Sequence, residues 1–153
     1  MNIFVVNSDP MIAARSLCDQ HVVKMPLENC QMLSALFEDD YCGYPKSVKK
    51  HPCTLWLKQS KQNVIWLLDH HAELLDEYTS RYKKVHKFHE SDLYFFDLLE
   101  KSDIPDIDRT PFCNATPYKE MDTIPAYRHY YRKDKTSFAR WRYSEKPQWL
   151  LEA

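Results

Sequence analysis

The sequence predicts a mainly α fold in one domain that spans residues 1–153. Apolar residues recur at steps of three, four and seven from Cys53 to Lys84, which is typical of a long buried helix. The chain contains one glycine, which argues against many tight β-hairpins. With 44% hydrophobic and 28% charged residues, a chain of this length can bury a useful core. We therefore expect a single compact helical domain of about three substantial helices with long covering loops.

The chain start should be a buried extended segment followed by a capped helix. Residues 1–6 are mostly apolar, and their burial would hold the first residue in place, whereas most chain ends fray. Asp9 and Pro10 suit the N-cap and first positions of a helix, which should end near Cys18. Its inward side chains should be Met11, Ala14 and Leu17.

A second helical segment should run from Asp19 to about Phe37, with Pro26 kinking or restarting it. The polar stretch 38–52 predicts a loop, and the basic residues within it give the loop a positively charged edge. Cys53–Lys84 then predicts one long central core helix.

Three shorter segments complete the predicted fold. Ser91 can cap a short helix over residues 92–100. Residues 101–125 contain four prolines, so they should form an irregular arm that lies over the helices. A last helix should begin at Thr123 and end near Lys133, before a basic and aromatic tail.

Composition excludes several function classes. Phosphate-binding loops need several glycines, so nucleotide folds of the P-loop and dinucleotide types are excluded. Five cysteines without a Cys-x-x-Cys pair, and an apolar start too short for a signal peptide, favour a reduced, cytoplasmic protein (the host cytoplasm if a phage encodes it). No apolar run approaches the roughly 18 residues of a membrane helix, so we expect no membrane contact.

The stretch Asp19–Glu28 is the first candidate for chemistry. On a helix His21, Lys24 and Glu28 share one face, because steps of three and four residues return to the same side. A carboxylate beside an amine and an imidazole suits proton transfer, and it equally suits a surface salt bridge. Spacing alone leaves both interpretations open.

The last third of the chain is electrostatically distinct. Between Pro125 and Pro147, seven basic residues and two acidic ones give a local charge of +5, against −1 for the whole chain. Six aromatic residues are interleaved with them. Basic groups neutralise phosphates and rings stack on bases, which predicts DNA or nucleotide as partner; the alternative is a core of rings beneath a solvated basic surface.

Metal and cofactor signals are weak. Histidines and cysteines lie two or three apart in places, yet none of these pairs makes a two-plus-two zinc pattern. We therefore expect no metal and no cofactor, and a hydrolase with a His and Cys metal site ranks third among the hypotheses.

The sequence Leu17-Cys18-Asp19-Gln20-His21 resembles the Leu-Ala-Asp-Gln-His opening of the small pyrimidine-dimer DNA glycosylases, the endonuclease V type of T-even phages. In that family a glutamate follows the histidine by seven residues, as Glu28 follows His21 here. The stretch 126–131 is similar to the aromatic region with which the family grips DNA. The chain start also resembles short uncharacterised phage proteins.

The resemblance implies an all-α glycosylase in which the N-terminal α-amine attacks the deoxyribose of a damaged nucleotide. The glutamate assists, the base leaves, an imine forms and the strand is then cut. An α-amine has a pKa of about 8, so a useful fraction is unprotonated near neutral pH. This family needs no metal.

The chain departs from the family pattern at two places. The family exposes a threonine amine after its initiator methionine is removed, whereas Asn2 is too large for efficient removal and leaves the amine on Met1. Leu27 and Gln31 stand where the family has phosphate-binding arginines, so Lys24 or Arg15 would have to replace them.

We predict a metal-free DNA glycosylase, with possible AP-lyase activity, that acts on a damaged or modified base. The expected catalytic residues are Met1, Glu28, His21 and Lys24. The expected substrate-binding residues are Asn2, Arg15, His51, Arg81, Arg128, Tyr130, Tyr131, Lys135, Arg140 and Trp141. The competing hypothesis is a non-catalytic phage effector that binds nucleic acid or a host protein through its basic, aromatic last third. The sequence does not predict the oligomeric state.

Overall fold

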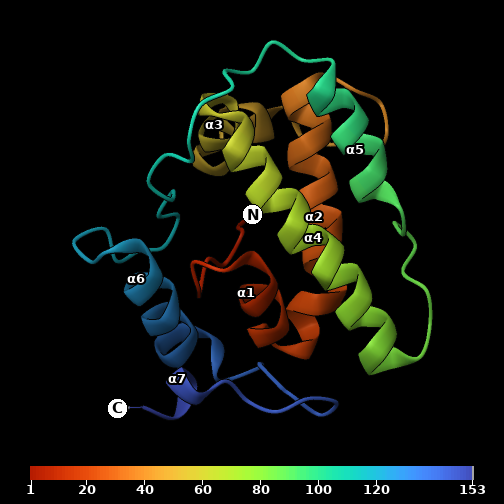
Figure 1. Cartoon of the computed structure of the whole chain (residues 1–153). Coiled ribbons are helices and arrows are strands. Elements are labelled where there is room, and N and C mark those ends of the chain that lie inside the picture. Colours follow the sequence, from red (N-terminus) through yellow and green to blue (C-terminus); the bar gives the residue numbers. More distant parts are fainter. Residues whose placement is uncertain (153) are drawn as a thin grey trace.

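Helix α4, Lys61–Tyr82, is the central element of the fold. The computed structural model describes residues 1–152, and Figure 1 shows α4 beside α2, Asp19–Phe37, in the middle of the molecule. The other neighbours of α4 are α1 (Pro10–Ser16), α3 (Pro52–Gln59) and α5 (Ser91–Glu100). No strand occurs in the described part of the chain, so the predicted mainly α fold is confirmed.

Helix α1 begins as predicted but differs in which face it buries. The Asp9 carboxylate accepts hydrogen bonds from the backbone N–H groups of Met11 and Ile12, at 2.8 and 3.2 Å. Ala14 is buried as expected, whereas the prediction that Met11 faces inward is wrong, because its side chain is 43% exposed. Ala13 and Ala14 form the buried face, and Met11 lies two residues, about 200°, from Ala13 around the helix.

The predicted long helix over residues 53–84 is two helices, α3 and α4, that are separated at Ser60. Ser60 has extended backbone angles, and its hydroxyl accepts a hydrogen bond from Gln62 N at 3.0 Å. The same hydroxyl donates to the carbonyl of Ile107 at 2.6 Å. The prediction of one helix is therefore wrong, because the backbone breaks at Ser60, whose side chain caps α4 and is tied to the irregular arm, although the apolar spacing continues.

Helix α2 is continuous through Pro26, so the predicted restart at this residue does not occur. The loop that follows contains a short 3₁₀ helix, η1 (Lys46–Lys50), which anchors it through the buried Val48. Ser91 is the first residue of α5 rather than its side-chain cap, because its hydroxyl is bonded to His71 Nε2 at 2.6 Å.

The last third forms a separate group of elements beside α1 (Figure 1). Helix α6, Thr123–Tyr130, continues into a π-helical turn, η2 (Tyr131–Lys135), and the short α7, Gln148–Leu151, lies close to the end of the described chain. The preceding arm is irregular as predicted. It is tied to the start of α4, because Lys61 N donates to the carbonyl of Pro105 at 2.8 Å.

The chain start is buried as predicted, but it turns instead of forming a strand. Residues 2–6 are each at most 7% exposed. Phe4 has a φ of 59°, the left-handed region that bulky residues rarely adopt, and Val6 N donates to the carbonyl of Phe4 at 2.8 Å. In residues 1–152 no helix has the length and apolar character needed to cross a bilayer.

Candidate active site

A cavity of about 310 Å³ opens beside the chain start. Its walls come from three parts of the sequence: the first residues, one face of α2, and the C-terminal elements, with Ala115 of the irregular arm at the edge. The side chains that matter below are Met1, Phe4, His21, Lys24, Glu28, Tyr130, Lys135 and Phe138. The structure thus brings the predicted catalytic residues together around one cavity.

The amine of Met1 lies 3.5 Å from Glu28 Oε1, as an ion pair. Lys24 Nζ lies 3.6 Å from Glu28 Oε2, and the backbone N–H of Asn2 donates to Oε1 at 3.2 Å. Glu28 is only 6% exposed. A carboxylate held between two amines in a half-open cavity can accept a proton from one of them, which is the arrangement that general base catalysis requires.

The Asn2 side chain accepts hydrogen bonds that turn the chain directly after Met1. Asn2 Oδ1 accepts from the backbone N–H groups of Ile3 and Phe4, at 2.8 and 3.1 Å, and these bonds turn the chain. The Phe4 ring then stacks on His21 with ring centroids 4.2 Å apart. Arg128 Nε donates to the carbonyl of Val6 at 2.8 Å. The first residues are therefore held at both ends of the turn.

His21 is a neutral side chain in this site. Burial, together with the positive charges of Lys135 and Lys24, lowers the pKa of His21 to about 3. Its Nδ1 is hydrogen-bonded to the hydroxyl of Tyr131, which also accepts from Cys18 N at 3.3 Å. His21 therefore lacks the proton of a general acid near neutral pH. It can orient groups in the cavity instead.

His51 lies near the chain start but does not line the cavity. Its Nδ1 accepts from Cys53 N at 3.1 Å and caps α3. The pKa of His51 is lowered, first by burial and then by the positive charge of the terminal amine. The Met1 backbone and the Glu28 carboxylate act in the opposite direction. His51 is therefore close to the terminal amine. The sequence indicated only that His51 belongs to a basic loop, and it did not predict this proximity.

The C-terminal residues divide between the cavity and its surroundings. Tyr130 and Lys135 line the cavity, with Lys135 Nζ 4.4 Å from the centre of the Tyr130 ring. Tyr131 is fully buried behind His21, and burial raises its pKa well above the usual value of 10. Arg140 and Trp141 lie outside the cavity, in a neighbouring hollow of about 380 Å³.

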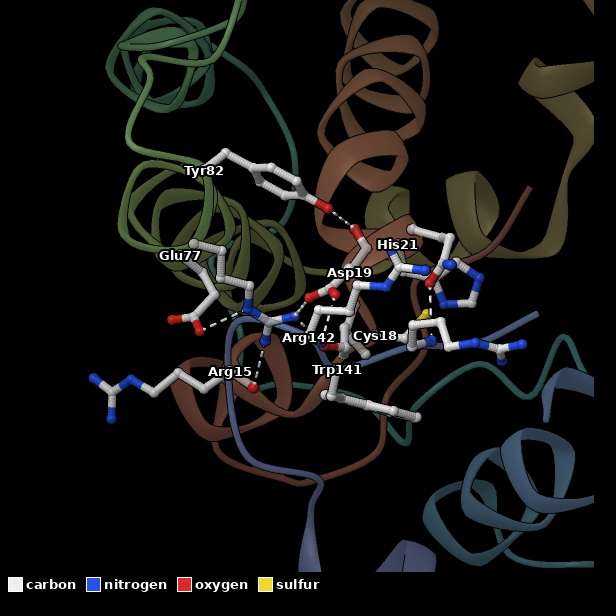
Figure 2. A network of polar contacts seen from close by, with 12 residues as sticks. Arg15, Cys18, Asp19, His21, Glu77, Tyr82, Trp141 and Arg142 are labelled. Atoms are coloured by element: carbon white, nitrogen blue, oxygen red, sulfur yellow. Dashed lines mark hydrogen bonds and ion pairs between the residues drawn. The ribbon is translucent and has the colours of Figure 1, made fainter. Parts of the chain in front are cut away.

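Arg15 and Arg81 lie away from the cavity and bind groups of the protein itself. Arg15 Nε pairs with Glu73 at 2.8 Å. Arg81 is 3% exposed and pairs with Asp19 at 3.0 Å and with Glu77 at 3.0 Å. In Figure 2 the labelled carboxylates of Asp19 and Glu77 lie on either side of one guanidinium group, to which dashed lines join them.

Phe4 and Phe138 are cavity residues that the sequence did not single out as site residues. Both lie in apolar or aromatic stretches, where a cavity wall and a core position look alike. The alternation of rings and basic residues around Phe138 was the available signal. The sequence around Phe4 contained no such signal, because the turn of its backbone is visible only in the fold.

Comparison with known proteins agrees with this geometry. A sequence model of the family described as pyrimidine dimer DNA glycosylase matches residues 1–90, more than half of the chain. The match contains the turned chain start, His21, Lys24 and Glu28. No curated protein and no solved structure is significantly similar to the chain. The chain belongs to the pyrimidine dimer DNA glycosylase family.

Proposed function

We propose that this DNA glycosylase uses the α-amine of Met1 as its nucleophile and Glu28 as its acid-base group, on a damaged or modified base. The observation that carries the proposal is the contact of 3.5 Å between amine and carboxylate at the wall of an open cavity. An amine held beside a carboxylate is a competent nucleophile once it has lost its proton. Membership of the family favours an enzyme over a non-catalytic effector.

The proposed reaction begins when the unprotonated amine attacks C1′ of the deoxyribose. The new C–N bond forms as the glycosidic bond breaks, and the base leaves with the electron pair of that bond. Glu28 accepts the surplus amine proton and then delivers it to the ring oxygen, which opens the sugar and leaves an imine. Loss of a proton from C2′ would expel the 3′ phosphate and cut the strand, which is the lyase step.

The cavity walls and the basic C-terminal residues are the proposed contacts with DNA. Tyr130 and Phe138 line the cavity and can contact a base that has left the stack. Within residues 1–152, none of the seven basic side chains between Pro125 and Pro147 forms an ion pair. Their charge is therefore free to neutralise phosphates.

Borohydride trapping tests the proposal, because hydride reduction turns the imine into a stable secondary amine. We expect a covalent adduct on DNA that carries pyrimidine dimers, abasic sites or modified bases, with the link at the first residue. Glu28→Gln should lower the trapped yield about 100-fold, the usual scale of general acid–base catalysis. The matched control is Glu100→Gln, which changes an exposed glutamate of α5 outside the site.

Mass spectrometry of the trapped peptide also identifies which amine reacts. Asn2 N lies 3.2 Å from Glu28, so a chain that has lost Met1 would present the Asn2 amine to the same carboxylate. A protein that forms no adduct with any of the three substrates would refute the amine mechanism. An adduct linked through a lysine, such as Lys24, would refute the assignment to the α-amine.

A further inference from the structure

The first residues of α2 bind the backbone of the C-terminal segment 138–142 through four hydrogen bonds. Asp19 N donates to the carbonyl of Arg140 at 2.7 Å, and Asp19 Oδ2 accepts from Arg142 N at 2.8 Å. Gln20 Nε2 donates to the carbonyl of Phe138 at 2.8 Å, and Gln20 Oε1 accepts from Arg140 N at 3.0 Å. We call this set of four bonds the Asp19–Gln20 clasp.

A buried network holds the Asp19 end of the clasp. Arg81 neutralises Asp19 Oδ1 and also donates to the carbonyls of Arg15 and Leu17, at 2.9 and 2.8 Å. Trp141 Nε1 donates to the carbonyl of Ser16 at 3.1 Å. Three successive carbonyls at the end of α1, those of residues 15–17, are therefore hydrogen-bonded. Figure 2 shows Arg15, Asp19 and Trp141 gathered at this corner. The corner is a rigid base for the clasp.

The segment that the clasp holds lines two hollows. Phe138 and the preceding Lys135 form one wall of the active-site cavity. The side chains of Arg140 and Arg142 line an outer hollow of about 470 Å³, together with Tyr82 and Tyr143. Gln20 borders both hollows. The position of the cavity wall, and of two guanidinium groups that form no ion pair within the described residues, thus depends on the same four bonds.

Resting on the proposed function, we propose that Asp19 and Gln20 are positioning residues that keep the C-terminal segment in place to bind DNA at the active-site cavity. Asp19 acts through the backbone of Arg140 and Arg142, and Gln20 acts through Phe138 and Arg140. The side chain of Gln20 uses both of its polar atoms in the clasp, so its role is to hold the segment. Loosening the segment lowers the fraction of protein that is competent to bind and leaves the amine and Glu28 unchanged.

Gln20→Met tests the clasp, because it keeps the length of the side chain and removes two of the four hydrogen bonds. Gln20 is exposed, so the variant should fold, and circular dichroism checks this. Trypsin cleaves after Arg140 and Arg142, and we expect cleavage there to be about tenfold faster when two bonds are lost. The control is Gln62→Met, the same change at an exposed position of α4 whose side chain has no hydrogen bond within the described residues.

Steady-state kinetics on dimer-containing duplex separate a positioning role from a merely structural one. We expect KM to rise about threefold in Gln20→Met while kcat stays constant, because only the competent fraction falls. If trypsin cleaves Gln20→Met at the wild-type rate, the clasp does not hold the segment. If cleavage is faster but KM is unchanged, the clasp has no role in binding DNA. If the wild-type protein shows no turnover, the proposed function fails, and the Kd for the same duplex then decides the role of the clasp in the same way.

Discussion

His21, His70 and His71 are buried histidines whose protonation links the stability of the fold to pH. Burial is the main cause in each case, and it lowers their pKa values to about 3, 4 and 3 respectively. The unfolded chain binds these protons near pH 6.5, whereas the folded chain binds them only near pH 3 to 4. Their contribution to stability is therefore complete above pH 6.5 and is lost as the pH falls toward 4.

We predict that the free energy of unfolding falls by at least about 2 kcal/mol between pH 7 and pH 5, because each buried histidine alone contributes on that order. Urea denaturation at the two pH values measures the change. His70→Gln removes one of the three groups and should reduce the pH dependence by about a third. His89→Gln, at an exposed position, is the control; an equal reduction in both variants would contradict the assignment to burial.

At the residue scale, the sequence predicted the members of the site better than their surroundings. The spacing of His21, Lys24 and Glu28 placed them on one helix face, and the family resemblance added the amine. The surroundings of these residues depend on long-range contacts. Arg81, for example, pairs with Asp19, which lies 62 residues earlier in the chain. No local pattern carries such a pairing, because it depends on how α1, α2 and α4 pack.

At the scale of elements, Ser60 separates α3 from α4 and ties this break to the irregular arm. The flanking sequence Lys58-Gln59-Ser60-Lys61-Gln62 contains neither glycine nor proline, and the apolar spacing continues on both sides. The break was therefore not predictable from periodicity. A serine that accepts from the helix and donates to the arm becomes recognisable only when Ile107 is placed beside it.

We predict that Ser60→Ala lowers the free energy of unfolding by about 0.5 to 2 kcal/mol, the range for loss of an N-cap residue. The change removes the bond from Gln62 N and leaves the carbonyl of Ile107 without this donor. Chemical denaturation measures the effect. Ser80→Ala, at an exposed position in the last turn of α4, should change stability by less than about 0.5 kcal/mol. If both substitutions lower the free energy of unfolding equally, the Ser60 side chain does not stabilise the fold as a helix cap.

At the scale of the whole molecule, the first residues and the last third of the chain meet at one cavity. The first residues, α2 and the C-terminal segment each supply a wall, although well over 100 residues separate Phe4 from Phe138. The predicted helical fold was confirmed because helices follow local patterns. The meeting of the first residues with the last third of the chain was predictable only through the family resemblance, since no local pattern in the last third points to the first residues.

We predict that DNA affinity depends steeply on salt and that Arg140→Ala lowers the slope of log K against log salt concentration by about 1, the value for one lost phosphate contact. Fluorescence anisotropy with a duplex at several salt concentrations measures the slope. Lys101→Ala is the control, because Lys101 is paired with Asp97 on α5, far along the chain from the basic segment. An unchanged slope in Arg140→Ala would place the DNA elsewhere on the surface.

The buried, turned start of the chain has a practical consequence for producing the protein. An affinity tag or fusion partner ahead of Met1 would convert its primary amine into an amide, which is not nucleophilic. It would also force extra residues into a turn that is held on both sides. Such a preparation could be soluble and well folded and still be inert. A tag placed after α7 leaves the amine free, so a comparison of the two formats gives an inexpensive first test of the site.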